Sequence, residues 1–510
     1  MESSLNLQVY NSTCILNPRY KLRLDEKRIL FYYKEIDPPS DKDISNLLVF
    51  IHPVFAILLS LFDGKRRLKR VVNEFSYITG LKEELVIALI SQLVENKTGV
   101  KVEWNHSSFY FPKNTLIRTK HKNDIIHYNP YDFLIPNSQL DFQTRRLYRP
   151  LDTTLILNNI CVTRCIYCYA DKRKSCTCQI PLTRMIELIR EANKMEMRSF
   201  TISGGEIFTY RYWKEILKVL VENNFDPFIT TKYPLNERKI KELKDIGIKH
   251  IRLSLDTIKC SEMCKLLNIN EKYYGLILKT LENLDKNNFD IRIQSQVTSI
   301  NQESMEEFID YLLKFENITR ISVRATRFSL YPKGDKLDYL SIRPVKNKFD
   351  EIKALIIKLN EKTADRVQLD FLEYPIREKY INSSAQEKRV LFENRGQCSG
   401  NFYSFHILPD GKVTICEELY WHPQFIIGDL MKQSINEVWN SDKAKSLYHL
   451  ARDSIRDQSA CKTCDNLNRC HQHRGVCWKQ VLAAYGEENW DYPDPRCPLA
   501  PKPYNEFWIE

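Results

Sequence analysis

The stretch 154-TLILNNICVTRCIYC-168 joins an apolar run to three cysteines, Cys161, Cys165 and Cys168, in the spacing C-x3-C-x2-C. The apolar residues 154–157 predict the end of a buried strand, so the cysteines lie on the loop that follows it. Iron–sulfur clusters are usually held by four thiolates. Three thiols on one loop would leave one iron of a cubane without a protein ligand and therefore open to a substrate or cofactor.

Tyr167, just before the third cysteine, extends the pattern to C-x3-C-aromatic-C. This loop resembles the signature of radical S-adenosylmethionine (radical SAM) enzymes. The resemblance implies that Cys161, Cys165 and Cys168 hold a [4Fe–4S] cluster, and that SAM binds the open iron and is cleaved reductively to a 5′-deoxyadenosyl radical. It also implies that Tyr167 lies near the adenine. A zinc site is the alternative, although zinc normally takes four ligands at C-x2-C spacings.

The composition indicates a soluble protein of three or four domains, since the chain has 510 residues, 43% of them apolar. Its net charge of +11 suits nucleic acid, an acidic peptide or an acidic membrane surface, and does not choose among them. Fifteen cysteines without a secretory leader pattern in residues 1–20 predict metal or catalytic use in the cytoplasm rather than disulfides. The most apolar segment, residues 47–62, is too short to span a membrane and is predicted to be a buried helix.

Strands and helices are predicted to alternate after residue 150, which is typical of an α/β fold. Six β/α units would make a partial (β/α)6 TIM-like barrel over residues 150–345, with its active site at the carboxyl ends of the strands, where the cysteine loop lies. The predicted strands are 153–157, 199–203, 227–231, 250–255, 291–298 and 319–326, and helices include 181–194 and 210–223. Four of the strands alternate polar and apolar residues, so we expect a polar, ligand-filled barrel interior.

The sequence Ser203-Gly204-Gly205-Glu206 ends the second predicted strand. Two glycines allow close approach of backbone to a ligand, and a carboxylate can bind an ammonium group. Placed after the cysteine loop, this motif resembles the one that binds the SAM amino group in radical SAM enzymes.

The same resemblance makes Ser254 and Gln296 candidates for contacts with the SAM ribose or carboxylate, although a structural hydrogen bond would look the same in the sequence. Arg324 could clamp a carboxylate or pair with Asp256.

Residues 1–118 are predicted to form a small winged-helix-like domain, followed by a polar linker over residues 119–149. The sequences FAILLSLFDGKRRLKRVVNEF (55–75) and EELVIALISQLVENKTGVKV (83–102) resemble the leader-peptide recognition element of ribosomal-peptide maturation systems. In that family the leader adds a strand to the sheet edge and packs against the third helix. A DNA-binding winged helix is the alternative, because residues 65–70 are rich in Lys and Arg.

Residues 346–395 are predicted to connect the barrel to a cysteine-rich domain over residues 396–510. This connecting region is predicted to contain an amphipathic helix over residues 349–360. Its hairpin HILPDGKVTIC (406–416) and its seven cysteines resemble the SPASM domain, which binds auxiliary [4Fe–4S] clusters. The resemblance assigns one cluster to Cys398, Cys416 and Cys477, and a second cluster to Cys461, Cys464, Cys470 and Cys497.

The gap of six residues before Cys477 departs from the usual three, and the first cluster lacks a fourth cysteine, so a water, a histidine or a substrate thiol would complete it. Two structural zinc sites are the alternative. Five further cysteines are predicted to be non-functional: Cys14, Cys176, Cys178, Cys260 and Cys264.

Together these resemblances imply a radical SAM/SPASM peptide maturase of the sactipeptide type, which joins a cysteine sulfur to a carbon of a ribosomally made precursor peptide. Carbon–carbon cross-linking is the alternative within the class. The expected partners are the precursor peptide and an electron donor such as flavodoxin or ferredoxin, with no membrane and without nucleic acid. An RNA-modifying radical SAM enzyme and a zinc-containing DNA-binding protein are the alternatives from other classes.

Overall fold

The computed structural model describes residues 12–35, 48–118, 125–172, 175–326, 329–331, 339–363, 365–372, 383–473 and 475–504. The chain divides into two compact units, residues 1–148 and 149–510, and each has its own hydrophobic core. Within the described ranges, no helix combines the length and the apolar character that a membrane crossing requires.

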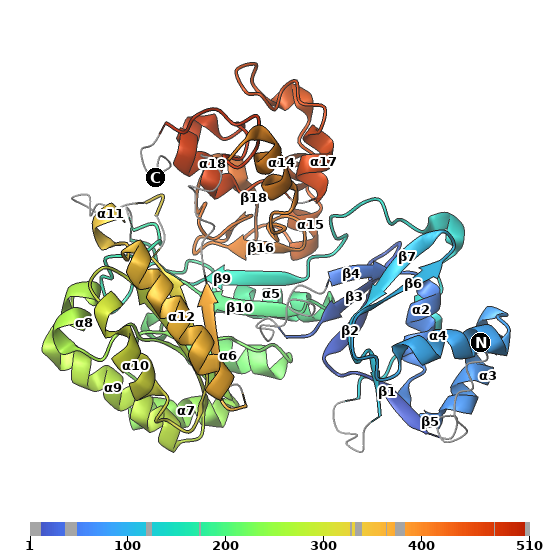
Figure 1. Ribbon diagram of the computed structural model, residues 1–510, viewed down its shortest axis with the longest axis horizontal. Coiled ribbons are helices and arrows are strands. Elements are labelled where there is room, and N and C mark those ends of the chain that lie inside the picture. Colours follow the sequence, from blue (N-terminus) through green and yellow to red (C-terminus); the bar gives the residue numbers. More distant parts are fainter. Residues whose placement is uncertain are drawn as a thin grey trace. The chain divides into compact units, whose positions relative to one another are not determined.

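The described residues of the first unit form three α-helices and three small antiparallel sheets, which are labelled in Figure 1. The sheets have the strand orders β2-β3-β4, β5-β1-β8 and β6-β7. This combination of helices and small sheets is compatible with the predicted winged-helix-like domain. The elements are β1 (Thr13–Leu16), β2 (Tyr20–Leu24), β3 (Ile29–Tyr33), β4 (Leu48–Ile51), α2 (Pro53–Ser60), β5 (Asp63–Arg67), α3 (Leu68–Thr79), α4 (Glu83–Leu93), β6 (Val100–Trp104), β7 (Ser107–Phe111) and β8 (Leu116–Ile117).

The apolar segment 47–62 is not one helix, as its composition predicted, but strand β4 followed by helix α2. Proline disfavours helical backbone in the residue before it and suits the first position of a helix. His52 accordingly has extended backbone, its ring accepts a hydrogen bond from the Val54 N–H, and the helix begins at Pro53. The His52-Pro53 pair therefore divides the segment.

The predicted linker is in part packed against the first unit. The Arg28 guanidinium donates to the Arg146 carbonyl at 2.6 Å, and the Tyr148 N–H donates to the Asp25 carboxylate at 3.3 Å. Asp25 and Arg28 are fully buried and form an ion pair at 3.0 Å. Residues 141–148 are thus tied to the turn between β2 and β3.

The second unit contains two five-stranded sheets with orders β10-β9-β16-β17-β18 and β11-β12-β13-β14-β15. The second sheet is entirely parallel, which is the pattern of β/α units. Its strands and those beside them are β9 (Asp152–Ile156), β10 (Ser199–Ser203), β11 (Thr230–Thr231), β12 (His250–Ser254), β13 (Asp290–Val297), β14 (Ile318–Ala325), β15 (Gln368–Leu372), β16 (Ser404–Ile407), β17 (Lys412–Thr414) and β18 (Ile426–Asp429).

Helices pack around these strands, and several neighbouring helices contact one another, such as α5 with α6, α6 with α7 and α8 with α9. Figure 1 shows α8, α9, α10 and α12 gathered on one side. The helices are α5 (Leu182–Lys194), α6 (Trp213–Glu222), α7 (Glu237–Ile246), α8 (Cys260–Leu267), α9 (Glu271–Lys286), α10 (Met305–Leu312), α11 (Tyr339–Ile342), α12 (Lys346–Thr363), α14 (Ala385–Glu393), α15 (Ile435–Trp439), α16 (Asp442–Tyr448), α17 (Leu467–His473) and α18 (Trp478–Tyr485). Seven short 3-10 turns complete the fold: Pro130–Phe133, Asn137–Gln139, Ile207–Thr209, Gln302–Ser304, Pro423–Phe425, Arg452–Ser454 and Glu487–Asn489.

All six predicted barrel strands are present, but the third is shorter than predicted. Phe228 has a positive φ of 50°, and its N–H donates to the Asp226 side chain, so a turn delays strand β11 to Thr230. β15, which extends the second sheet beside β14, was not predicted. β16 and β17 are the two arms of the predicted hairpin, but the parallel pairing of β16 with β9 was not predicted. The α/β barrel-like fold is therefore confirmed, with its strands divided between two sheets.

The polar faces of β12, β13 and β14 lie in register across the sheet. Ser254 is opposite Gln294, which is opposite Ser322, and Gln296 is opposite Arg324. The alternating apolar residues of these strands are buried beneath the helices. The polar faces therefore line the other side, as the alternation predicted.

Candidate functional site

The loop that carries Cys161, Cys165 and Cys168 leaves the carboxyl end of β9 and is anchored to the end of α8. The Arg164 N–H donates to the Leu267 carbonyl at 2.8 Å, and the Ile166 N–H donates to the Leu266 carbonyl at 2.9 Å. The Thr163 hydroxyl lies 3.4 Å from the Cys161 sulfur and 3.2 Å from the Cys165 sulfur. One hydroxyl thus holds two of the three thiols together, and the loop lies where barrel enzymes place their active sites.

Gly204 and Gly205 bring the end of β10 against the backbone that leads into this loop. Gly204 has a φ of 133°, which favours glycine. The Gly205 N–H donates to the Asn158 carbonyl at 2.6 Å, and a Cβ at Gly205 would lie 1.9 Å from the Ile160 carbonyl oxygen. The glycines therefore allow close approach of two chain segments, one of which begins the cysteine loop.

Replacing Gly205 with alanine should displace the cysteine loop, because the contact is with backbone that cannot rotate away. We expect a loss of about 3 kcal/mol or more in the free energy of unfolding, measured by chemical denaturation, together with about four fewer irons per chain. Gly275→Ala is the matched control: a Cβ at this position in α9 meets no atom within 4 Å, and alanine favours helix. Equal behaviour of the two variants would contradict this role for Gly205.

Glu206 is buried, and its carboxylate lies at the carboxyl end of β11. It accepts hydrogen bonds from the Thr231 hydroxyl at 2.8 Å, the Lys232 N–H at 3.1 Å and the Phe208 N–H at 3.4 Å. Burial raises the pKa of this carboxyl to about 7. The carboxylate is thus positioned by two neighbouring segments, and its contact with the SAM amino group stays a prediction.

Tyr167 is joined to the ends of three strands through Asp256. The Asp256 carboxylate accepts hydrogen bonds from the Tyr167 hydroxyl, from the Lys232 ammonium at 3.0 Å and from the Gln296 N–H at 2.8 Å. The same ammonium donates to the Ser254 carbonyl at 3.3 Å. The structure therefore brings Tyr167, Ser254 and Gln296 together around a buried ion pair beside the cysteine loop.

Lys232 is a functional candidate that the sequence analysis missed, and Asp256 was named there only as a possible partner of Arg324. Lys232 directly follows β11, and Asp256 lies two residues after the end of β12. Their placement at the carboxyl ends of barrel strands is the signal that could have identified both. The pKa of Lys232 is raised because Asp256, Cys165 and Cys161 lie near its ammonium. A cation is therefore held near Cys161 and Cys165, two of the three thiols of the loop.

The cysteine loop also contacts the segment that contains Cys416. The Tyr169 hydroxyl donates to the Glu417 carboxylate at 3.3 Å, and the Gln179 N–H donates to the Pro409 carbonyl at 2.7 Å. The pKa of Tyr169 is raised well above its usual value, chiefly by Glu417. The two cysteine-bearing segments are thus adjacent within the second unit.

The seven cysteines of residues 396–510 form two groups. Burial raises the pKa of Cys416, and Cys398 and Cys477 lie close enough to raise it further. Burial likewise raises the pKa of Cys461 to about 12, with further contributions from Cys497, Cys470 and Cys464. These are the two sets that the SPASM resemblance assigned. The second set lines one cavity of about 320 Å³.

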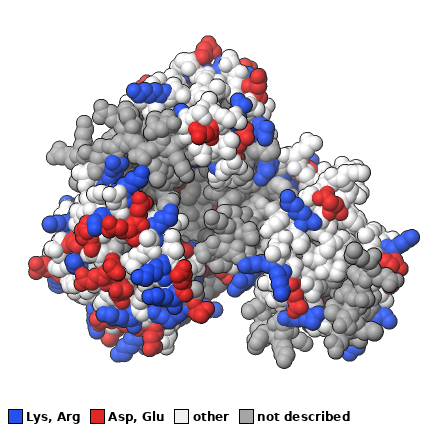
Figure 2. All heavy atoms as spheres, viewed as in Figure 1, with Lys and Arg blue, Asp and Glu red and all other residues white. Residues whose placement is uncertain are grey.

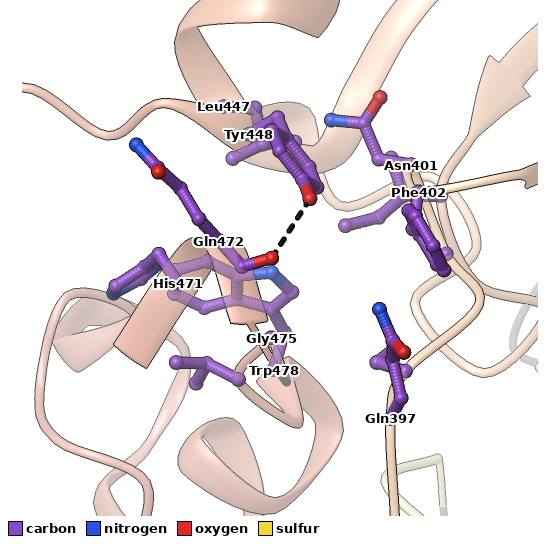
Figure 3. A pocket seen from close by; sticks show the side chains of 13 residues that line it. Gln397, Asn401, Phe402, Leu447, Tyr448, His471, Gln472, Gly475 and Trp478 are labelled. Carbon is purple, nitrogen blue, oxygen red and sulfur yellow. Dashed lines mark hydrogen bonds between the residues drawn. The ribbon is translucent and has the colours of Figure 1, made fainter. Parts of the chain in front are cut away.

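Cys398 lines a second, smaller pocket, shown in Figure 3 with His471 and Trp478 on one wall and Gln397 and Phe402 on the other. In Figure 3 the Tyr448 hydroxyl donates to the Gln472 carbonyl, at 3.0 Å, across the pocket. Burial lowers the pKa of His471 to about 4, so its imidazole is neutral at pH 7. A neutral imidazole therefore lies in the pocket that contains a cysteine of the three-cysteine set.

The donor sets fit iron–sulfur clusters, because all three consist of cysteines and thiolates are the usual ligands of these clusters. Among the residues that the structure describes, no three His, Cys, Asp or Glu side chains converge as ligands of one metal ion. A cubane places each thiolate on a separate iron, so its cysteines need not converge on one point. The grouping of three, three and four thiols matches three clusters.

The basic net charge is not concentrated on the face shown in Figure 2. There Lys and Arg alternate with Asp and Glu over α8, α9, α10 and α12. Several form ion pairs, such as Lys259 with Glu307 and Lys348 with Glu351. The surface of these four helices is therefore mixed in charge.

Comparisons with known families agree with the site. Residues 155–315 match the model of the radical SAM superfamily, and residues 398–465 match the SPASM model, an iron–sulfur cluster-binding domain. The chain thus contains a radical SAM domain, which binds a [4Fe–4S] cluster and SAM, and a SPASM domain, which binds auxiliary iron–sulfur clusters. The resemblances found in both cysteine motifs are confirmed.

Two curated relatives span much of the chain. A probable GTP 3′,8-cyclase of Methanosarcina mazei is 19% identical over 60% of this chain and 84% of its own length. An Fe-coproporphyrin III synthase of Methanosarcina barkeri is 23% identical over 66% of this chain and 85% of its own length. These two names differ, so the relatives indicate no common substrate for this chain.

Among solved structures, SuiB of Streptococcus suis bound to S-adenosylmethionine superposes with a TM-score of 0.60 at 17% identity, over 95% of this chain and 99% of SuiB. SuiB has also been solved with its precursor peptide SuiA, with a TM-score of 0.58. At this identity the likeness establishes a shared fold, and it extends over both units of the chain.

Proposed function

We propose that this chain, as a radical SAM enzyme with a SPASM domain, is a maturase that cross-links a ribosomally made precursor peptide. The observation that carries the proposal is the fold likeness to SuiB, a protein solved with SAM and with a precursor peptide, over 95% of this chain. The GTP cyclase relative matches 60% of the chain and supports the shared radical SAM module only.

The first unit is proposed to capture the leader of the precursor. β4 is an edge strand of the β2-β3-β4 sheet and leads into the three helices α2, α3 and α4. An extended peptide can add to such an edge through backbone hydrogen bonds, with side-chain pockets supplying specificity. We assign the leader to β4 and α4, the elements that the family resemblance indicates.

In the second unit, Cys161, Cys165 and Cys168 are proposed to hold the cluster that binds SAM. When bound, that cluster supplies the electron that cleaves SAM to methionine and a 5′-deoxyadenosyl radical. The side chains around it position the cofactor: Glu206 would take the ammonium group, and the Tyr167–Asp256–Lys232 network would fix the wall beside it. Tyr167 is assigned to the adenine, and Ser254 and Gln296 to the ribose or carboxylate.

The three-cysteine and four-cysteine sets are proposed to hold the two auxiliary clusters. His471 supports one way to complete the first cluster, because its neutral imidazole lies in the Cys398 pocket. A water and a substrate thiol are the other two ways, and the thiol would suit the bond that we propose, from a cysteine sulfur to a carbon. A carbon–carbon cross-link is the alternative product.

The proposal is tested with the anaerobic enzyme, SAM, a reductant such as flavodoxin or ferredoxin, and short peptides encoded beside its gene. We expect 5′-deoxyadenosine and a peptide that has lost two hydrogen atoms for each cross-link, detected by mass spectrometry. Blocking the peptide cysteines with iodoacetamide should prevent a thioether but leave a carbon–carbon cross-link. Conversion of GTP instead of any peptide would contradict the proposal.

A further inference from the structure

Arg395 is a buried cation at the wall of the four-cysteine cavity. It follows helix α14 and is 6% exposed. Its Nη2 lies 3.3 Å from the Cys470 sulfur and 3.2 Å from the Cys470 carbonyl oxygen. A guanidinium therefore donates directly to one of the four sulfurs assigned to the second auxiliary cluster.

The guanidinium is held in that orientation by several further contacts. Its Nη1 donates to the Phe392 carbonyl at 2.6 Å, and its Nε and Nη2 donate to the Gly475 carbonyl at 3.2 and 2.8 Å. The central carbon of the guanidinium, Cζ, lies 3.6 Å from the centre of the Phe392 ring. Because these contacts fix the side chain, the N–H that faces Cys470 is aimed before any cluster is reduced.

The other arginines that are near the cavity are arranged differently. Arg389 and Arg469 line it but are exposed, where water screens their charge. Arg496 is directed to the buried Asp494, whose carboxylate it contacts at 2.6 and 2.7 Å. Arg395 thus differs from these three in combining burial with a contact to a cysteine sulfur.

We propose that Arg395 raises the reduction potential of the cluster held by Cys461, Cys464, Cys470 and Cys497. One-electron reduction adds a negative charge to the cluster and its sulfurs. An N–H donor and a positive charge in a poorly hydrated site stabilise that reduced form more than the oxidised form. The residue would make this cluster the better acceptor of the electron that remains when a substrate radical closes its cross-link.

The inference rests on the proposed function only in assigning a cluster to these four cysteines. It is therefore tested by a redox titration and not by turnover. The full chain with Cys161, Cys165 and Cys168 changed to alanine is reconstituted, so that only auxiliary clusters remain. It is then titrated with dithionite and followed by electron paramagnetic resonance. Two midpoint potentials are expected in this background.

Arg395→Gln should lower one of the two potentials and leave the other in place. We expect the ratio of reduced to oxidised cluster at a given solution potential to fall about tenfold. For a one-electron couple this corresponds to a decrease of about 59 mV in the midpoint potential. Arg395→Lys keeps the charge without the guanidinium fork, so it should give a smaller fall. Arg389→Gln is the matched control, which removes an exposed charge at the same cavity and should shift neither potential.

An unchanged pair of potentials in Arg395→Gln would overturn the inference, as would equal shifts in Arg389→Gln. Loss of about four irons from both Arg395 variants would do so too, because it would make the residue a support of the fold. If the reconstituted wild-type protein contained no iron, the proposed function itself would be contradicted. The failure of the inference and the failure of the proposed function are therefore distinguishable.

Discussion

Changing Cys161, Cys165 and Cys168 together to alanine should abolish the formation of 5′-deoxyadenosine from SAM. These thiols lie on one anchored loop beside Lys232 and Asp256, and two of them share the Thr163 hydroxyl. Without them no cluster can form on this loop, where the open iron for SAM is expected. Chromatography of anaerobic reactions with dithionite should show product only at the level of the reaction without enzyme.

The double variant Cys260→Ser with Cys264→Ser is the control for this experiment. These two sulfurs lie 4.0 Å apart on α8 and belong to none of the three assigned sets. The control should retain its iron and SAM cleavage. Cleavage by the triple variant at the wild-type rate would contradict the assignment of the radical site.

Removing residues 1–148 should separate SAM cleavage from peptide modification. The two units have separate cores, so the remaining chain keeps the barrel and all ten assigned cysteines. Without leader capture, the core peptide must bind from solution, and we expect peptide modification to fall about 100-fold or more. Mass spectrometry of the peptide and assay of 5′-deoxyadenosine measure the two activities in the same reaction.

The matched control leaves the protein whole and removes the leader from the peptide. If the first unit binds the leader, the intact enzyme with this shortened peptide should show the same loss as the truncated enzyme with the full peptide. Modification of the full peptide by the truncated enzyme at the intact rate would show that the first unit is not the leader receptor.

The cysteine loop and the six barrel strands were predictable because each depends on local pattern, either a thiol spacing or an alternation of polar and apolar residues. Strand β15 was not predicted, and neither was the pairing of the predicted hairpin strand β16 with β9, because these two strands lie about 250 residues apart in the sequence. The strand β4 was hidden in an apolar run whose division depends on Pro53 alone.

The candidate site was predicted where a motif marks it and missed where only three-dimensional contacts do. Glu206 and Tyr167 were found through their motifs, whereas Lys232 and Asp256 belong to no motif that the sequence analysis used. Their pairing joins the ends of two strands. Arg395 likewise lies in a segment without a recognisable sequence motif. It became a candidate only through its contact with the Cys470 sulfur in the structure.

The most direct test of the account is the iron and acid-labile sulfide content of the anaerobically reconstituted chain, compared with that of the Cys161, Cys165 and Cys168 triple variant. Three cubanes predict about twelve irons in the wild type and about eight in the variant. Zinc in place of iron, or equal iron in the two proteins, would contradict a radical SAM site on this loop.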